Sequence, residues 1–212
     1  EVRVLYAKGC ELVKSKTETL AKEYDRLMEA VTVAEHSDVV ILCLGLDETM
    51  EGEELDEGNN SGSGDKKDLE LPSVQKKLLE EIVRTKKPVI LCMMAGSAMN
   101  LSFSEEHCNG ILQTWYPGAR GGRAVADILF GKSSPSGKLP ITFYRTLDFM
   151  PEFTDYAMTN RTYRFMKEEA LYPFGFGLTY GDIVCNFADI LKPVVENKDI
   201  KIQVEATNTG VF

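Results

Sequence analysis

The chain has 212 residues, of which 43% are hydrophobic and 27% charged, and its formal net charge of −9 gives a pI near 4.9. This length suffices for one good-sized domain with a full core plus an extension. The excess of negative charge argues against nucleic acid and against an anionic membrane surface as main partners, because both select basic patches. No apolar run approaches the roughly 18 residues that cross a bilayer. We therefore expect a globular protein with no nucleic-acid and no membrane partner.

Five cysteines are present, an odd number, and no two of them form a CxxC pair. Cys43 and Cys92 lie inside apolar runs, where a free thiol packs like a small hydrophobe. This usage predicts a reducing compartment rather than a disulfide framework, and hence a cytoplasmic location. The chain does not begin with Met, and it ends where an alternating strand pattern has just reached a turn; both features predict a fragment of a longer polypeptide.

The first half of the chain alternates strand and helix patterns. Residues 2–10 (VRVLYAKGC) predict a short strand, and residues 18–36 predict a helix because apolar side chains recur there at helical spacing. Residues 38–45 (DVVILCLG) form a continuous apolar run, which is typical of a strand covered on both faces. A helix with one apolar face over 71–87 and a second buried strand over 88–94 follow.

The second half continues this alternation and then changes character. We expect a third strand over 110–116, a helix over 118–131 and a short edge or terminal strand over 138–143. Residues 144–181 are rich in aromatic residues, Gly and Pro, and predict an irregular wrap over the sheet. Residues 182–212 resemble the first strands of a separate β-domain.

The order of these elements predicts an α/β fold. Residues 1–181 would form a mainly parallel sheet sandwiched by helices, and residues 182–212 the truncated start of the β-domain. Open sheets of this type bind ligands at the carboxyl ends of their strands. The loop after strand 38–45 begins at such an end and is therefore the first candidate site.

This loop, DETMEGEELDEGNNSGSGDK (47–66), carries seven acidic side chains in its first eleven positions. It could be a solvated surface loop, a calcium loop or the source of a catalytic carboxyl group. With Asp47 at position 1, position 12 of a calcium loop is Gly58, where a bidentate Glu is required, so the spacing argues against calcium. Clustered carboxylates raise one another's pKa, so one member can stay protonated near neutral pH, as a general acid must.

The remaining motifs give little support to other chemistry. GARGGRAV (118–125) lies at a strand-to-helix turn but lacks the spacing of a phosphate-binding loop, so a tight turn is the better interpretation. His36 and His107 are the only histidines and have no zinc-motif context, and we expect neither a metal nor a cofactor. Ser97, in AGSAM, is not in a nucleophile elbow.

Trp115 and Tyr116 end the third predicted strand. Their rings could pack in the core, or they could form a stacking platform for the C–H face of a sugar. The sequence leaves these two roles open.

Four separated segments follow the order of motifs in a known family. They are the opening VRVLYAKGC, LELPSVQKKLLEEI (69–82), QTWYPGARGGRAVADILFGKSSPSGKLPITF (113–143) and NRTYRFMKEEALYPFGFGLTY (160–180). Together they resemble the second, α/β-sandwich domain of glycoside hydrolase family 3, over roughly residues 1–181. Residues 182–212 resemble the start of the fibronectin-III-like domain that follows it in many members. One departure is WYPGARGG, with Ala119 and Arg120 where WYPGQEGG is common.

The resemblance implies an active site between two domains. A preceding (β/α)8 barrel of the same polypeptide would supply an aspartate nucleophile, and a loop of the present domain would supply a glutamate acid/base. In the frame GLDETMEGEELDEGNNSGSGDKKDLELP this glutamate is expected at Glu53, with Glu51 as the runner-up. Asp65 and Lys66 fit the Asp-Arg/Lys element of the frame and are expected to bind substrate.

The implied reaction is retaining hydrolysis of terminal, non-reducing β-D-glucosides, without a cofactor, on a β-linked oligosaccharide or an aryl glycoside. Because the nucleophile would lie on the barrel, this chain alone is expected to be inactive. A β-xylosidase of the same family and a non-catalytic carbohydrate-binding or structural domain are the alternatives. A flavodoxin-like nucleotide binder also fits the fold but lacks a phosphate signature.

Overall fold

The computed structural model describes residues 2–13, 24–48, 50–52, 66–152, 154–190 and 195–210. The contacts divide the chain into two compact units. Unit 1 comprises Glu1–Gly121 with Ile141–Phe174, and unit 2 comprises Gly122–Pro140 with Gly175–Phe212. The domain boundary expected after residue 181 stays a prediction.

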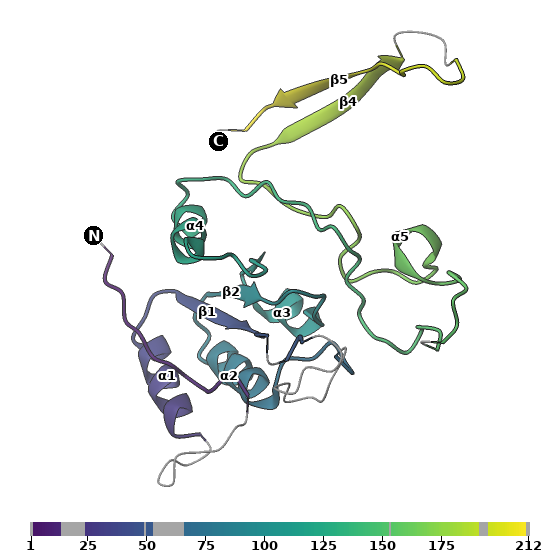
Figure 1. Ribbon diagram of the computed structural model, residues 1–212. Coiled ribbons are helices and arrows are strands. Elements are labelled where there is room, and N and C mark those ends of the chain that lie inside the picture. The colour runs from purple at the N-terminus through teal and green to yellow at the C-terminus, as the bar shows by residue number, and fades with distance from the viewer. Residues whose placement is uncertain are drawn as a thin grey trace. The chain divides into compact units, whose positions relative to one another are not determined.

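Unit 1 is built on a three-stranded parallel sheet in the order β1-β2-β3. Its strands are β1 (Val40–Gly45), β2 (Val89–Met94) and β3 (Gly110–Gln113). Neighbouring parallel strands need a crossover connection. Helix α2 (Ser73–Arg84) lies in the first crossover and α3 (Ser102–His107) in the second (Figure 1). The expected α/β fold with a parallel sheet is thus confirmed.

Helices α1 (Asp25–Glu35) and α2 lie side by side next to this sheet (Figure 1). The side chains of β1 alternate, so that Leu42 and Leu44 are buried while Ile41 is exposed. The other buried apolar side chains of the strands and α2 are Val74, Leu78, Leu79, Ile82, Val89, Leu91, Cys92 and Met93. Each fully buried side chain of this size stabilises the fold by about 1.5–3 kcal/mol. These residues form the core of unit 1.

A buried glutamine joins α2 to the carboxyl end of β1. The side-chain oxygen of Gln75 accepts a hydrogen bond from the Gly45 N–H at 2.8 Å, and its amide group donates to the Gly45 carbonyl at 2.7 Å. The same amide group donates to the carbonyl of Leu12 at 2.8 Å. Past the strand, the Leu46 N–H donates to the Met94 carbonyl at 2.8 Å. The point at which the acidic loop begins is therefore fixed from two sides.

The prediction of a strand over residues 2–10 is wrong. Residues 2–9 have no regular secondary structure, and the side chains of Val2, Val4 and Tyr6 are 67%, 80% and 82% exposed. The alternating pattern favours an extended chain, but a strand forms only where a neighbour supplies the ladder hydrogen bonds. No described strand pairs with this segment.

The prediction of a strand over residues 138–143 is also wrong. Within unit 2, the Leu139 N–H donates to the Phe176 carbonyl at 2.8 Å. Within unit 1, Phe143 forms only an isolated bridge with Tyr172. Pro140 lies between them and has no N–H to donate, so it cannot contribute to a continuous ladder.

The other predicted elements are present with shorter bounds. Helix α1 falls inside the predicted 18–36, whose first part lies partly outside the described residues, and β3 ends three residues before the predicted end. Helix α4 (Gly121–Leu129) confirms the helix predicted after the third strand. Helix α3 and the four-residue α5 (Thr162–Phe165) were not predicted. Both span fewer than two turns and leave little periodic pattern.

Unit 2 contains the antiparallel pair β4 (Ile183–Ile190) and β5 (Ile202–Asn208). Strands after residue 181 are therefore confirmed, whereas a fibronectin-III-like domain stays a prediction. None of the helices in the described ranges has the length and apolarity that a membrane crossing requires.

Candidate active site

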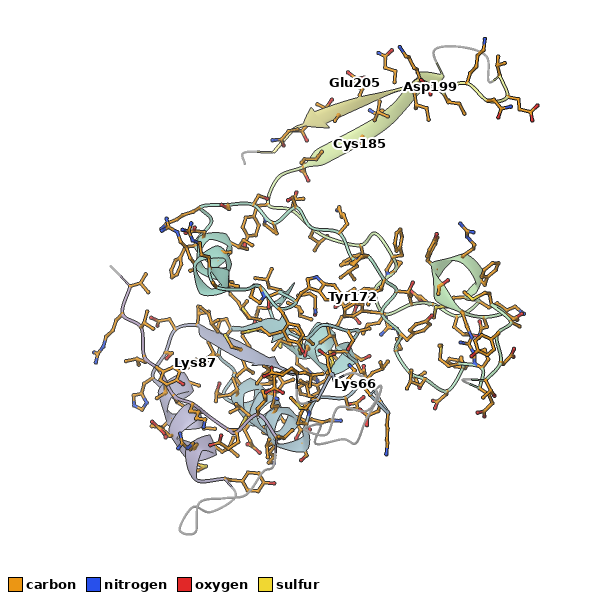
Figure 2. The ribbon with its side chains drawn as sticks, viewed as in Figure 1. Lys66, Lys87, Tyr172, Cys185, Asp199 and Glu205 are labelled. Atoms are coloured by element: carbon orange, nitrogen blue, oxygen red, sulfur yellow. The ribbon has the colours of Figure 1, made fainter. Side chains whose placement is uncertain are left out.

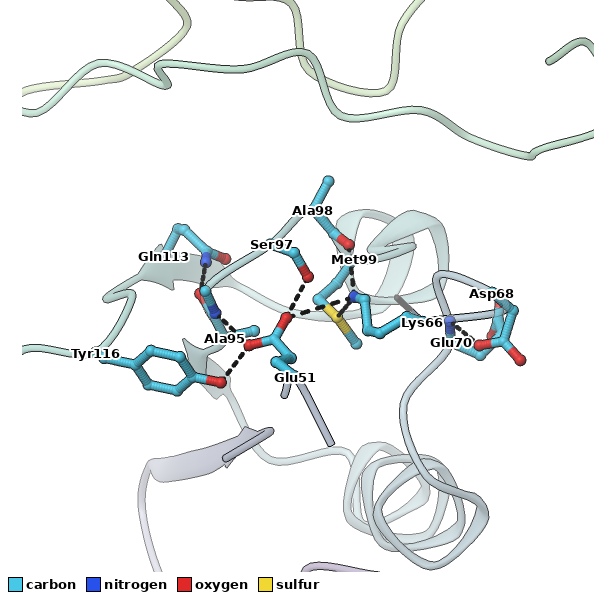
Figure 3. Close-up of polar contacts among 11 residues, drawn as sticks. Glu51, Lys66, Asp68, Glu70, Ala95, Ser97, Ala98, Met99, Gln113 and Tyr116 are labelled. Carbon is cyan, nitrogen blue, oxygen red and sulfur yellow. Dashed lines mark hydrogen bonds and ion pairs between the residues drawn. The ribbon is translucent and has the colours of Figure 1, made fainter. Parts of the chain in front are cut away.

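The acidic loop leaves the sheet at the carboxyl end of β1 through a turn. The Asp47 carbonyl accepts hydrogen bonds from the N–H groups of Met50 and Glu51, both at 3.0 Å. Met50 is 5% exposed, so its side chain belongs to the core. This turn places the Glu51 side chain beside the segments that follow β2 and β3 (Figure 3).

The Glu51 carboxylate accepts hydrogen bonds from both neighbouring segments. The Gly96 N–H, just past β2, donates to Oε2 at 2.7 Å, and the Ser97 hydroxyl donates to Oε1 (Figure 3). The Tyr116 hydroxyl, just past β3, also donates to Oε2. Only 11% of the Glu51 side chain is exposed. The ends of the three strands therefore meet at this carboxylate.

Lys66 lies in the segment that leads into α2 and is the positively charged neighbour of the Glu51 carboxylate (Figure 2). Its Nζ lies 3.8 Å from Oε1 of Glu51 and donates at 3.0 Å to the Ala98 carbonyl and at 3.0 Å to Sδ of Met99. An ammonium group has three N–H donors. The ammonium group of Lys66 is therefore surrounded by acceptors from the protein itself.

Electrostatics keeps the Glu51 carboxylate charged. Burial on its own would raise the pKa of Glu51, but the hydrogen bonds from Ser97, Tyr116 and Gly96 and the charge of Lys66 outweigh it and lower the pKa below 4.5. Burial, followed by hydrogen bonding to the carboxylate, raises the pKa of Tyr116. At neutral pH Glu51 is thus an ionised acceptor and Tyr116 a protonated donor.

The pKa of Lys66 is lowered as well, but for a lysine this shift disfavours the charged form. Burial lowers the pKa of its ammonium group, and the nearby charges of Glu51 and Asp68 only partly offset that effect. The carboxylate of Glu51 therefore helps to keep a partly desolvated lysine protonated.

The two aromatic residues after β3 have different roles. Trp115 has a φ of 54°, in the left-handed region that bulky residues rarely adopt. Its ring meets the ring of Phe143, which is 1% exposed, edge-on at 6.3 Å. The neighbouring Tyr116 is 49% exposed and reaches Glu51. Core packing therefore fits Trp115, and Tyr116 belongs to the site.

The glycines of GARGG form the tight turn that the sequence indicated. Gly118 has a φ of 69°, and a Cβ on Gly121 would lie 2.4 Å from Cγ of Pro117. The Gly121 N–H donates to the Gly118 carbonyl at 3.0 Å. The need for glycine at these two positions follows from the turn itself.

Of the predicted site residues, the structure brings together Glu51 and Lys66, while Glu53 and Asp65 lie outside the described residues. Sequence reasoning missed Ser97 and Tyr116 as their partners. Each lies three positions past the end of its strand, so the tendency of parallel sheets to bind ligands at carboxyl ends could have indicated both. Within the described ranges, no three His, Cys, Asp or Glu side chains gather as a metal site requires.

The fold and the position of this site define the class of protein. It is an α/β domain that gathers polar groups at the carboxyl ends of a parallel sheet. The profile described as "Glycosyl hydrolase family 3 C-terminal domain" matches residues 7–180. The chain belongs to this family, as the motifs indicated.

Individual relatives agree with this assignment. The chain is 41% identical, over 81% of its length, to a xylan 1,4-beta-xylosidase of Xylanibacter ruminicola, and 32% identical, over 98%, to a periplasmic beta-glucosidase of Salmonella typhimurium. The solved structure of a β-glucosidase from Erythrobacter marinus aligns with 97% of the chain, with a TM-score of 0.76 and 30% identity. The chain spans 20% of the xylosidase and 29% of each glucosidase.

Proposed function

We propose that this chain is the acid/base-supplying domain of a retaining β-glycosidase that hydrolyses terminal β-D-xylosides or β-D-glucosides. The observation that carries the proposal is the family match over residues 7–180, which spans the acidic loop. A (β/α)8 barrel of the same polypeptide would supply the aspartate nucleophile. This chain alone would then be inactive, and its cytoplasmic location stays a prediction.

Glu53 is the proposed proton donor and acceptor. In a retaining mechanism, one carboxyl group protonates the leaving oxygen and then, as a base, activates water. The runner-up, Glu51, has a lowered pKa and accepts three hydrogen bonds, which disfavours the protonated form that the first step needs. Lys66 is already engaged with protein atoms, so of the two proposed substrate-binding residues Asp65 is the better candidate for a sugar contact.

Two observations bear on the choice between the two sugars, and they favour different substrates. The EGEE loop with its Gly-rich insertion favours β-glucosides. The higher identity to the xylan 1,4-beta-xylosidase, 41% against 32%, favours β-xylosides. A hydroxymethyl group is a modest steric difference that a pocket can tolerate, so we expect some activity on both.

The test compares 4-nitrophenyl β-xyloside with the β-glucoside, and each with the corresponding unactivated disaccharide as a poor leaving group, using the full-length polypeptide and its Glu53→Gln variant. We expect the variant to lose about 100-fold or more on poor leaving groups. On the 4-nitrophenyl glycosides azide should partly restore its turnover and form a glycosyl azide, because the anion attacks the anomeric carbon of the glycosyl-enzyme in place of water, displaces the aspartate and needs no general base. Glu54→Gln, which removes the adjacent charge, is the matched control and should retain activity.

Two results would overturn the proposal. One is wild-type protein with no turnover of either glycoside, which would favour a non-catalytic carbohydrate-binding domain. The other is a Glu53→Gln variant with full activity on poor leaving groups.

A further inference from the structure

Glu51 lies at the centre of a cluster of polar groups that the proposed acid/base chemistry does not use. The Glu51 cluster comprises Glu51, Lys66, Gly96, Ser97 and Tyr116. We propose that Glu51 is a positioning residue, which fixes the acidic loop against the segments after β2 and β3. The inference rests on the proposed function, because it assigns proton transfer to Glu53.

The first support is the number and origin of the contacts. Oε2 of Glu51 accepts from the Gly96 N–H and the Tyr116 hydroxyl, while Oε1 accepts from the Ser97 hydroxyl and faces Lys66. An ionised carboxylate has about four acceptor sites. Few are left for a substrate, and the contacts come from three parts of the chain that are distant in sequence. Such a carboxylate fixes backbone segments relative to one another.

The second support is the short reach from Glu51 to Glu53. Two residues of extended chain span at most about 7 Å, so fixing Glu51 confines the backbone of Glu53 to that radius. The ion pair with Lys66 also joins the two ends of the intervening segment. A chain segment with both ends held samples fewer conformations. In this proposal, Glu51 and Lys66 hold the two ends of the sequence segment that contains Glu53.

The third support is the backbone strain at Trp115. Its φ of 54° lies in the left-handed region, which a bulky non-glycine residue rarely adopts. This conformation allows the Trp115 ring to meet Phe143 while the next residue, Tyr116, reaches Glu51. Strain of this kind persists where the surrounding structure maintains it, commonly at functional sites.

The chemical consequence is a loss of precision in proton transfer when the cluster is broken. A displacement of about 1 Å can cost 100-fold in rate. In Glu51→Gln, one acceptor oxygen becomes an N–H₂ group and the negative charge facing Lys66 is lost, so the attachment of the loop would weaken. The acid/base Glu53 would remain present but poorly placed.

The experiment uses the full-length polypeptide with Glu51→Gln, Tyr116→Phe and Glu53→Gln. Glu81→Gln, on the exposed face of α2, is the matched control. Each is assayed on an activated 2,4-dinitrophenyl glycoside and on an unactivated disaccharide, with and without azide. Hydrogen exchange of the peptide covering residues 47–66 supplies a readout besides activity.

We expect Glu51→Gln to lower kcat on the disaccharide about 10- to 100-fold, with KM little changed and a smaller loss on the activated glycoside. Tyr116→Phe should have a weaker effect in the same direction, which keeps the test valid if Glu51→Gln does not fold. Neither variant should form a glycosyl azide, because Glu53 is still present. Exchange in residues 47–66 should rise in both and stay unchanged in Glu81→Gln.

Three outcomes would overturn the inference. Wild-type kinetics and exchange in Glu51→Gln, alongside an impaired Glu53→Gln, would remove the positioning role and leave the proposed function intact. Glycosyl azide from Glu51→Gln would make Glu51 the acid/base itself. A wild-type protein without glycosidase activity would overturn the proposed function together with the inference.

Discussion

Gln75 binds both backbone polar groups of Gly45 with its single side-chain amide. The two hydrogen bonds, of 2.8 and 2.7 Å, join the start of α2 to the last residue of β1. Gln75 is 1% exposed, so neither partner can turn to water instead. A polar side chain in the core thus fixes the strand end from which the acidic loop departs.

Replacing this amide should be costly. In Gln75→Leu the Gly45 N–H, the Gly45 carbonyl and the Leu12 carbonyl all lose their partner. Each unsatisfied buried group costs about 1–3 kcal/mol, so we expect a total loss of about 3 kcal/mol or more. Urea denaturation of variant and wild type measures it. A loss below about 0.5 kcal/mol would show that the amide is not needed.

The close approach of the Gly45 backbone to the Met94 carbonyl gives a second prediction. A Cβ there would lie 1.7 Å from the Met94 carbonyl oxygen, so Gly45→Ala requires β1 and β2 to separate. We expect a destabilisation of about 3 kcal/mol. The control is Gly122→Ala in α4, where nothing lies within 4 Å of the new methyl group and helix propensity favours alanine. Equal stability of the two variants in thermal denaturation would contradict the close approach.

Stability should depend on the charge of Glu51 in acid. Its pKa is lowered in the folded state, so its contribution is present above about pH 4.5 and is lost as pH falls through the lower folded value. The wild type should therefore exceed Glu51→Gln most at pH 6.5, and the difference should shrink by pH 3. Urea midpoints at several pH values test this. A difference that stays constant with pH would rule out the ionised carboxylate as its source.

Thiol reactivity gives a fourth prediction. Cys43 on β1 lies opposite Cys92 on β2, and a hydrogen bond from Cys92 lowers the pKa of the exposed Cys43 thiol, although partial burial opposes the shift. Burial raises the pKa of Cys10 and Cys108. Because the thiolate is the reactive form, iodoacetamide at pH 7 should label Cys43 several times faster than these two. Peptide mass spectrometry follows the time course.

The matched variant for this experiment is Cys92→Ala. It removes the hydrogen-bond donor and should slow the labelling of Cys43 without changing that of Cys10. Unchanged labelling of Cys43 would show that Cys92 does not influence it.

The sequence alone sufficed for features that depend on local pattern. Continuous apolar runs identified β1 and β2, and one apolar face identified α2, because side-chain periodicity follows directly from backbone geometry. The order of four motifs identified the family, and with it the loop that holds Glu51 and Glu53. These features can be predicted without knowing which residues are in contact in the folded chain.

Only the tertiary structure decided which groups meet. Residues 2–9 have the alternation of a strand but no described partner, so no strand forms. Ser97 and Tyr116 are 46 and 65 residues from Glu51 and become its partners because parallel pairing brings the ends of three strands to one edge. The pKa of Glu51 depends on those donors and on burial, which are long-range properties. A local pattern therefore determined the candidate carboxylates, and the packing of distant segments determined the charge and surroundings of Glu51.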